Sequence, residues 1–202
     1  MGVRDGDACR PYNGYDARMT RSIAVLVGSL RKDSFTRKVA HAIATLTPGL
    51  TFTHVELGNL SLYNQDVEAE PPASWIALRD ALRGADGYLF ATPEYNRSVP
   101  GVLKNAIDIA SRPYGKSAFG AGKPGAVVSV SPGALGAFGA NHHLRQSLVF
   151  LDVAVLQQPE MYVNSAAKLF DASGALTNDD TRALFTRFGA AFTAWVEKHV
   201  PR

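Results

Sequence analysis

The sequence contains a single cysteine, Cys9, among 202 residues. One cysteine excludes an internal disulfide framework and any zinc site that needs several cysteines. Because disulfides persist mainly in oxidising compartments, this usage favours a reducing cytoplasm. No apolar run reaches the ~18 to 20 residues of a membrane-spanning helix, and the N-terminal segment is too polar for a signal peptide. We therefore expect a soluble cytoplasmic protein with no membrane partner.

The sequence also lacks a strong excess of either charge. Lysine and arginine number 21, aspartate and glutamate number 18, and the formal net charge is +3. Without a basic cluster this balance indicates ordinary solvated surface, so we expect no nucleic-acid partner. A hydrophobic content of 46% suffices for one substantial core. We predict a flexible N-terminal extension over residues 1–20, with Met19 a candidate true start, and one domain over residues 21–202.

Apolar runs alternate with helical patterns along this domain. Nearly continuous apolar runs are typical of parallel strands that are covered on both faces, and all but the second of five runs have this character. The five runs are residues 23–27, 51–57, 88–91, 126–130 and 153–156. Helical periodicity begins near Val39, Trp75 and Val102, continues over residues 141–150, and returns after the cap-rich residues 177–180.

This alternation predicts an α/β fold, a flavodoxin-like three-layer sandwich. A five-stranded parallel sheet in the order 2-1-3-4-5 would carry helices on both faces. In that order the loops after the first, third and fourth strands share one edge, at the switch point where open α/β sheets bind ligands. The composition of these three loops therefore bears on function.

The first loop, GSLRKDSFT over residues 28–36, suits an anion. It leads into a helix whose free N–H groups and positive dipole end favour negative charge. Ser29, Ser34 and Thr36 supply hydroxyl donors, and Arg31 supplies a positive charge. The loop lacks the spacing of nucleoside triphosphate and dinucleotide motifs, and it has no thiolate nucleophile. Two interpretations remain. Either the loop binds a phosphate without phosphoryl transfer, or its hydroxyls only cap the helix.

The second loop, TPEYNRSVPG over residues 92–101, suits a planar heterocycle. Its two prolines stiffen the backbone, Tyr95 offers a flat face, and Asn96 offers both a donor and an acceptor. A rigid turn with a packed tyrosine would have the same pattern. Glu94 is either an active-site acid or a solvated surface charge. The third loop, residues 131–139, is rich in glycine, which suits either a backbone lid over a ligand or a flexible connection.

The stretches GSLRKDSFTRKVA and TPEYNRSVPGVLKNAIDIASRP, taken together, closely resemble the NADPH-dependent FMN reductase family. This family includes bacterial quinone and chromate reductases and azoreductase-like proteins. The resemblance runs from about Ser22 to about Tyr162 and includes HLRQSLVFLD at residues 143–152. It implies a flavodoxin-like fold that binds FMN without a covalent bond and takes electrons from NADPH or NADH.

The resemblance also implies which residues contact FMN, and it implies neither a catalytic side chain nor a metal ligand. In the first loop the contacts are Ser29, Arg31, Ser34, Phe35 and Thr36, at the phosphate and ribityl end. Around the isoalloxazine ring they are Pro93, Glu94, Tyr95 and Asn96, with Ser131 on the third side. The family often has asparagine where this chain has Thr36, so a hydroxyl donor replaces an amide there.

Members of the family commonly form dimers or tetramers, which implies a homodimer or homotetramer here. Some relatives have Arg and Tyr at the positions of Gly139 and His142, where they help to tie subunits together. Both residues differ in this chain, so dimerisation is the safer inference. The adjacent His142 and His143 would point about 100° apart on a helix and would not converge on one metal ion. We expect them to pack at the surface or at an interface.

The predicted function is hydride transfer from NAD(P)H through FMN to a small acceptor, by a ping-pong mechanism at one open flavin face. Such a face needs few specific contacts to accept quinones, free flavins, azo compounds or chromate. Two alternatives from other classes are a flavodoxin-type electron carrier and an FMN-binding regulatory protein without turnover. The slightly basic charge disfavours the carrier, because such proteins usually dock through strongly acidic surfaces.

Overall fold

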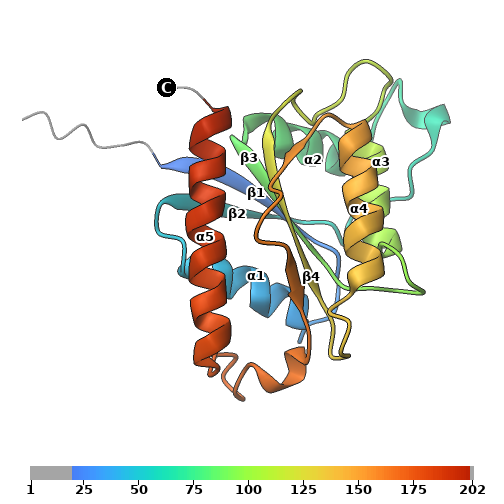
Figure 1. Ribbon diagram of the computed structural model, residues 1–202. Coiled ribbons are helices and arrows are strands. Elements are labelled where there is room, and N and C mark those ends of the chain that lie inside the picture. Colours follow the sequence, from blue (N-terminus) through green and yellow to red (C-terminus); the bar gives the residue numbers. More distant parts are fainter. Residues whose placement is uncertain (1–19, 201–202) are drawn as a thin grey trace, which may run out of the picture.

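The computed structural model describes residues 20–200. The predicted N-terminal extension therefore lies outside the described residues except for Thr20, and Met19 lies outside them too. The described chain forms a parallel sheet with helices on both faces (Figure 1). The strands are β1 (Arg21–Val27), β2 (Leu50–Val55), β3 (Gly87–Thr92), β4 (Pro124–Val130), β5 (Ala154–Val155) and β6 (Met161–Val163). The α-helices are α1 (Phe35–Thr45), α2 (Ala73–Gly84), α3 (Gly101–Ala110), α4 (Phe138–Phe150) and α5 (Asp179–His199).

The predicted strand order is confirmed, and the predicted strand number is wrong. The sheet runs β2-β1-β3-β4-β5, and every ladder is parallel. A sixth strand, β6, also pairs with β4, so two short strands share the position beside it. β5 pairs with Pro124 and Gly125, and β6 pairs with residues 128–130. The apolar run at 153–156 is too short to pair with all seven residues of β4, so a second segment completes the edge.

The helices divide into two layers that cover opposite faces of the sheet. α1 and α5 pack on one face, and their buried side chains join those of β1, β3, β4 and β6 in one core cluster. α2, α3 and α4 enclose a second cluster on the other face. Every residue of β3 and β4 is buried, whereas β2 alternates because it lies at an edge. In the described part of the chain, no helix is both long enough and apolar enough to cross a bilayer.

Side-chain caps mark the start of two of the five described α-helices. The Ser34 hydroxyl accepts a hydrogen bond from the Arg37 amide at the start of α1, and Asn178 does the same for Thr181 at the start of α5. α4 has no side-chain cap of its own, and it begins at Phe138, three residues before the predicted start at residue 141. Gly139 in its first turn conceals this start, since glycine has a low helix propensity.

Candidate functional site

The three unusual loops lie at one edge of the sheet, as the strand order predicted. β1 pairs with β3, and β3 with β4, so the carboxyl ends of all three strands are adjacent. The Gly28 amide donates a 2.8 Å hydrogen bond to the Ala91 carbonyl, which joins the start of the first loop to the end of β3. Figure 1 shows the three connections meeting near the N-terminal ends of α1 and α4. Side chains from residues 28–36, 92–101 and 131–139 can therefore contact a single ligand.

The first loop contains two buried residues whose hydroxyl groups remain accessible to solvent and have no partner among residues 20–200. Ser29 and Thr36 are buried, yet neither hydroxyl has a hydrogen-bond partner among residues 20–200. Helix capping accounts for Ser34, whose oxygen binds the Arg37 amide at 3.2 Å, but it leaves the other two hydroxyls unexplained. The amides of the first residues of α1 also lack acceptors within the helix. The loop therefore offers several donors to an anion at the positive end of α1.

Two further residues of the first loop differ in their surroundings. Arg31 is exposed, and no carboxylate of the described residues pairs with it. Its charge is thus available to a ligand. Phe35 is partly buried against the core beneath α1, with the Lys38 ammonium 5.8 Å from its ring. Packing fixes this ring and with it the first turn of α1.

The second loop contains a tight two-residue hairpin turn. The amide of Tyr95 donates to the Ser98 carbonyl at 3.1 Å, and the Ser98 amide returns a 3.0 Å bond to the Tyr95 carbonyl. Asn96 and Arg97, at the centre, have φ values of 51° and 63°. Such turns match the twist of a hairpin, but the left-handed conformation is uncommon for residues other than glycine and costs about 1 to 3 kcal/mol. The turn leaves Tyr95 exposed at the edge of the site.

Glu94 is not the solvated surface charge that one interpretation of the sequence predicted. Its side chain is only 16% exposed. Its Oε2 atom accepts a 3.0 Å hydrogen bond from the Ala140 amide of α4, and its Oε1 atom lies 3.9 Å from the Arg97 guanidinium. The carboxylate is therefore occupied by contacts within the protein, and it links the second loop to the helix after the third.

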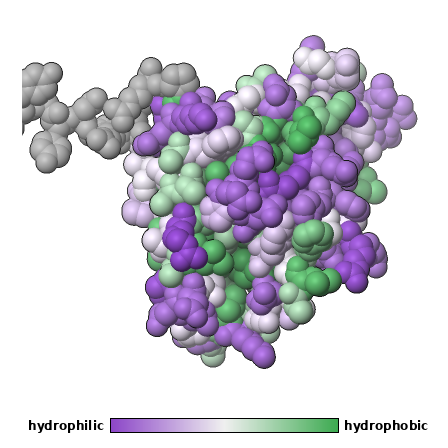
Figure 2. Space-filling view, viewed as in Figure 1, coloured by the Kyte–Doolittle hydropathy of each residue, from purple (hydrophilic) through white to green (hydrophobic). Residues whose placement is uncertain are grey.

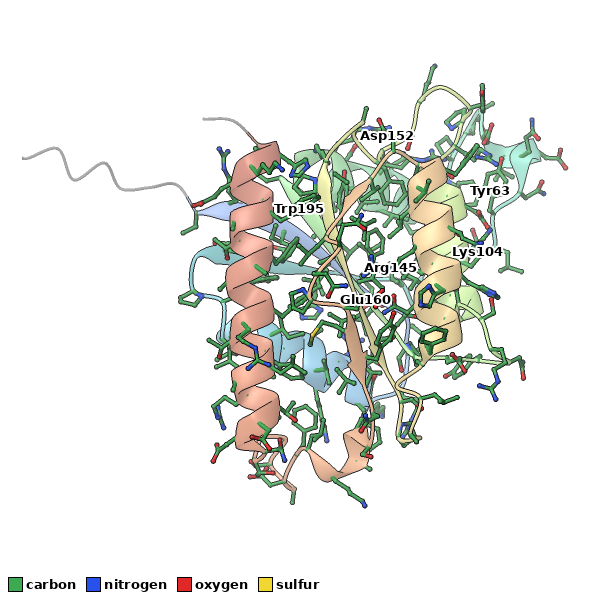
Figure 3. The ribbon with its side chains drawn as sticks, in the orientation of Figure 1. Tyr63, Lys104, Arg145, Asp152, Glu160 and Trp195 are labelled. Atoms are coloured by element: carbon green, nitrogen blue, oxygen red, sulfur yellow. The ribbon has the colours of Figure 1, made fainter. Side chains whose placement is uncertain are left out.

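The third loop rests on a buried polar network that sequence reasoning missed. The Ser129 hydroxyl donates to the Gly136 carbonyl at 2.7 Å, and the Asn141 side chain donates to that same hydroxyl and to the Met161 carbonyl. Arg145 in turn donates to the Asn141 side chain at 2.9 Å and to the Leu156 carbonyl, just after β5, at 3.1 Å. Figure 3 shows Arg145 between α4 and the chain that leads to β6.

This network fixes the glycine-rich loop and α4 on β4 and β6. One sequence signal was present, since Ser129 is a polar residue within an apolar strand and Asn141 and Arg145 are four apart. At the mouth of the loop, the Ser131 hydroxyl accepts a 3.0 Å bond from the Gly133 amide. Gly136 has a positive φ of 56°, and a Cβ atom there would lie 2.8 Å from the Tyr162 carbonyl carbon. Only glycine fits this position.

The two adjacent histidines of α4 bind different partners. His142 shares a 3.0 Å hydrogen bond with the Tyr162 hydroxyl and stacks against Phe138, with ring centroids 4.3 Å apart. His143 shares a 3.0 Å hydrogen bond with the Ser98 hydroxyl of the second loop. Burial, and then the neighbouring Glu160 carboxylate, raise the pKa of Tyr162 to about 12. This phenol is therefore protonated throughout the physiological range.

Known proteins resemble this chain over most of its length. Residues 21–168 match the model of the NADPH-dependent FMN reductase family. A quinone reductase of Pseudomonas putida is 60% identical over 178 residues, which is 87% of this chain and 95% of the relative. A 2-hydroxy-1,4-benzoquinone reductase of a Burkholderia species is 47% identical over 179 residues, covering 88% and 97% of the two chains.

Solved structures extend the comparison to three dimensions. The flavoenzyme FerB of Paracoccus denitrificans, an NAD(P)H:(acceptor) oxidoreductase, is 41% identical with a TM-score of 0.84. The alignment covers 89% of this chain and 98% of FerB. Because the six strands and the three loops lie within residues 21–168, which match the family model, the likeness includes the site as well as the sheet.

The buried network gives a prediction about stability. Asn141→Ala should lower the free energy of unfolding by about 2 to 3 kcal/mol, because Arg145 loses an acceptor and Ser129 loses a donor in a buried setting. Urea unfolding followed by circular dichroism measures this change. Asn164→Ala, at an exposed position after β6, is the control and should change stability by less than about 0.5 kcal/mol. Equal losses in the two variants would contradict a structural role for Asn141.

Proposed function

Because this chain belongs to the NADPH-dependent FMN reductase family, we propose that it oxidises NAD(P)H and reduces a small quinone at the three-loop edge of its sheet. It is an oxidoreductase with a flavodoxin-like fold, FMN as its cofactor and NAD(P)H as its electron donor. The observation that carries the proposal for the site is the pair of hydroxyls of Ser29 and Thr36 at the start of α1, which are open to solvent in otherwise buried residues and have no hydrogen-bond partner among residues 20–200. We place this activity in the cytoplasm, as the cysteine usage predicts.

The first loop has the properties that a phosphate monoester requires. We propose that Ser29, Ser34 and Thr36 donate hydroxyl hydrogens to the FMN phosphate, together with the first amides of α1. Arg31 adds a positive charge that no protein carboxylate neutralises in the described part of the chain. The hydroxyls of Ser29 and Thr36 have no partner among residues 20–200 and are open to solvent, so they can bind a phosphate without breaking a hydrogen bond within the described part of the protein.

The second and third loops would hold the planar ring. We propose that Pro93 to Asn96, with Ser131 on the third side, surround the isoalloxazine, that backbone N–H groups of these loops polarise its edge, and that Phe35 lies at the ribityl end. When bound, FMN supplies the hydride and electron chemistry between NAD(P)H and the acceptor. The chain positions the ring and leaves one side open. No side chain of the loops has to act as a general acid or base.

Exposed apolar side chains at this edge favour an aromatic acceptor such as a quinone. Tyr95 is 53% exposed, Leu135 is 61% exposed and Phe138 is 53% exposed, and they come from the second and third loops. Figure 2 shows hydrophobic residues at the surface near the N-terminal end of α4. An apolar ring buries area against such side chains, whereas a chromate ion would gain nothing from them. We therefore propose quinones as the preferred acceptors. NAD(P)H and the quinone would occupy the same open site in turn, as in a ping-pong mechanism.

The proposal is tested with the purified protein. We expect an absorption band of bound flavin that bleaches when NADPH is added under argon and returns when a benzoquinone is added. Steady-state rates should then give parallel double-reciprocal lines with the quinone as the varied substrate, as expected for ping-pong exchange. A flavin band that NADPH and NADH leave unchanged would favour an electron carrier. Protein that stays colourless after incubation with FMN would favour a regulatory protein.

The phosphate site gives a second prediction. Arg31→Ala should raise the Kd for FMN roughly tenfold, because a charge-assisted contact to phosphate is lost from a solvent-facing side chain. Quenching of FMN fluorescence during titration of the flavin-free protein measures the Kd. The control Arg187→Ala removes an exposed arginine from α5 and should leave the Kd unchanged. If both variants bind FMN as the wild type does, Arg31 does not contact the phosphate.

We also propose a homodimer that forms through α3 and α4. A groove of about 360 Å³ runs between these helices, lined by Lys104, Ile107, Asp108, Ser111, Arg112, Gln146, Ser147, Phe150 and Leu151. Figure 3 shows Lys104 on the α3 side of it. Next to the groove, Val149 is 74% exposed and Phe150 is 76% exposed at the end of α4. Two large neighbouring apolar side chains at such exposure are typical of an interface.

This interface is tested by light scattering after size exclusion. The wild-type protein should elute as a dimer, and Phe150→Asp should shift it to the monomer, because a charge would be buried without a partner. Ile76→Asp, which places the same charge on the exposed face of α2, is the control and should leave the dimer intact. A Phe150→Asp protein that remains dimeric at micromolar concentration would exclude this face.

A further inference from the structure

We propose that Glu94 is a positioning residue, whose carboxylate fastens the hairpin of residues 94–98 to the first turn of α4. In this role it acts through the protein, by making the second and third loops of the site one rigid unit. Its effect on FMN rests on the proposed function, whereas its contact with α4 does not. Three features of the described residues support the assignment: the missing cap of α4, the fit of the hairpin against the helix, and the charge balance around Glu94.

The first feature is that α4 has no cap of its own. Its N-cap residue, Ala137, adopts a left-handed conformation and offers no side-chain acceptor, and its first turn contains no acidic residue. The first amides of a helix have no acceptor within the helix, and its N-terminus carries a partial positive charge. Glu94 Oε2 accepts from the Ala140 amide at 3.0 Å. A residue 46 positions earlier in the sequence thus supplies both the missing acceptor and the missing negative charge.

The second feature is that the hairpin meets α4 at two further points. The Ser98 hydroxyl shares a 3.0 Å hydrogen bond with His143 Nδ1, about one turn along the helix from Ala140. Just before Ala140, the backbone of Gly139 approaches the Arg97 carbonyl so closely that a Cβ atom would lie 2.7 Å from its oxygen. The hairpin therefore lies directly against α4. Contacts on both sides of the turn hold Arg97 in its unfavourable left-handed conformation.

The third feature is that α4 is the main partner of the Glu94 charge. Arg97 is 3.9 Å away, and its side chain is 74% exposed, so this ion pair is weak. The hydrogen bond to Ala140 is shorter, at 3.0 Å, and its donor belongs to a fully buried residue. A charged acceptor at the first turn of a helix stabilises that turn through both the hydrogen bond and the dipole. Loss of the carboxylate would leave the Ala140 amide buried without an acceptor.

The consequence for the site follows from where the hairpin lies. Tyr95 and Asn96 are in the hairpin, and the glycine-rich loop ends at the same first turn of α4. The carboxylate therefore contributes, together with the Ser98–His143 hydrogen bond, to the relative position of two of the three loops. Because the exposed Tyr95 ring has little packing of its own, we infer that Glu94 limits its motion and preserves the ring-binding geometry.

The contact is tested first without reference to turnover. Amide hydrogen exchange at Ala140, followed by NMR in the full chain with and without FMN, should be at least tenfold faster in Glu94→Ala than in the wild type. Glu94→Gln should be intermediate, because its amide oxygen still accepts a hydrogen bond without the charge. Glu197→Ala, at an exposed position near the end of α5, is the matched control and should change nothing. Unchanged exchange in Glu94→Ala overturns the assignment.

The positioning role is tested by FMN affinity. Glu94→Ala should raise the Kd for FMN about tenfold and Glu94→Gln by less, with the unfolding temperature of the Gln variant close to that of the wild type. Ser98→Ala should weaken binding as well, and the double variant should lose less than the product of the two single losses, since both residues hold one hairpin. Normal FMN affinity in Glu94→Ala, or independent losses, would refute the role. Failure of the wild type to bind FMN refutes the proposed function instead, and hydrogen exchange still decides the contact.

Discussion

The parallel pairing of β1, β3 and β4 is the constraint on which the site depends. Parallel strands cannot be joined by short turns, so each is followed by a helical crossover, and all three carboxyl ends emerge at the same edge. The residues after these strands are then free of the sheet's hydrogen bonding and can turn toward a ligand. Because β3 and β4 are buried on both faces, the sheet itself holds the three loops at fixed distances from one another.

α4 is where the separate parts of the site are joined. Its first turn receives Glu94, its second turn carries His143 toward Ser98, and its inner face carries Asn141 to Ser129 beneath the glycine-rich loop. A helix without a cap has unsatisfied N–H groups in its first turn, which would hold the adjoining loops less firmly. Here the neighbouring loop provides the cap, and a buried polar network fixes the helix from below. Such networks stabilise one geometry because each buried donor and acceptor is costly to leave unpaired.

Most of the architecture could be predicted from residue patterns, and the failures have physical causes. The order of the strands follows from alternation and chain connectivity, and the capped helix start at Ser34 was readable locally. The division of the outer position between β5 and β6 was not readable, because a strand of three residues has no periodicity to detect. The start of α4 was misplaced for a related reason, since Gly139 is a poor helix former that tertiary contacts hold in the helix.

The sequence by itself determined the chemistry of the three loops, which suits a mononucleotide, and the strand order that brings them to one edge of the sheet. Hydroxyl and cationic residues before α1, a rigid loop with Tyr95 and a glycine-rich loop are local compositions, and their chemistry does not depend on distant contacts. The tertiary structure alone decided that Ser29 and Thr36 are buried residues whose hydroxyls have no partner among residues 20–200, and that Glu94 caps α4. Burial and long-range pairing are properties of atoms that lie far apart along the chain. A lone loop glutamate therefore has no local signal that distinguishes an active-site acid, a solvated charge and a structural contact.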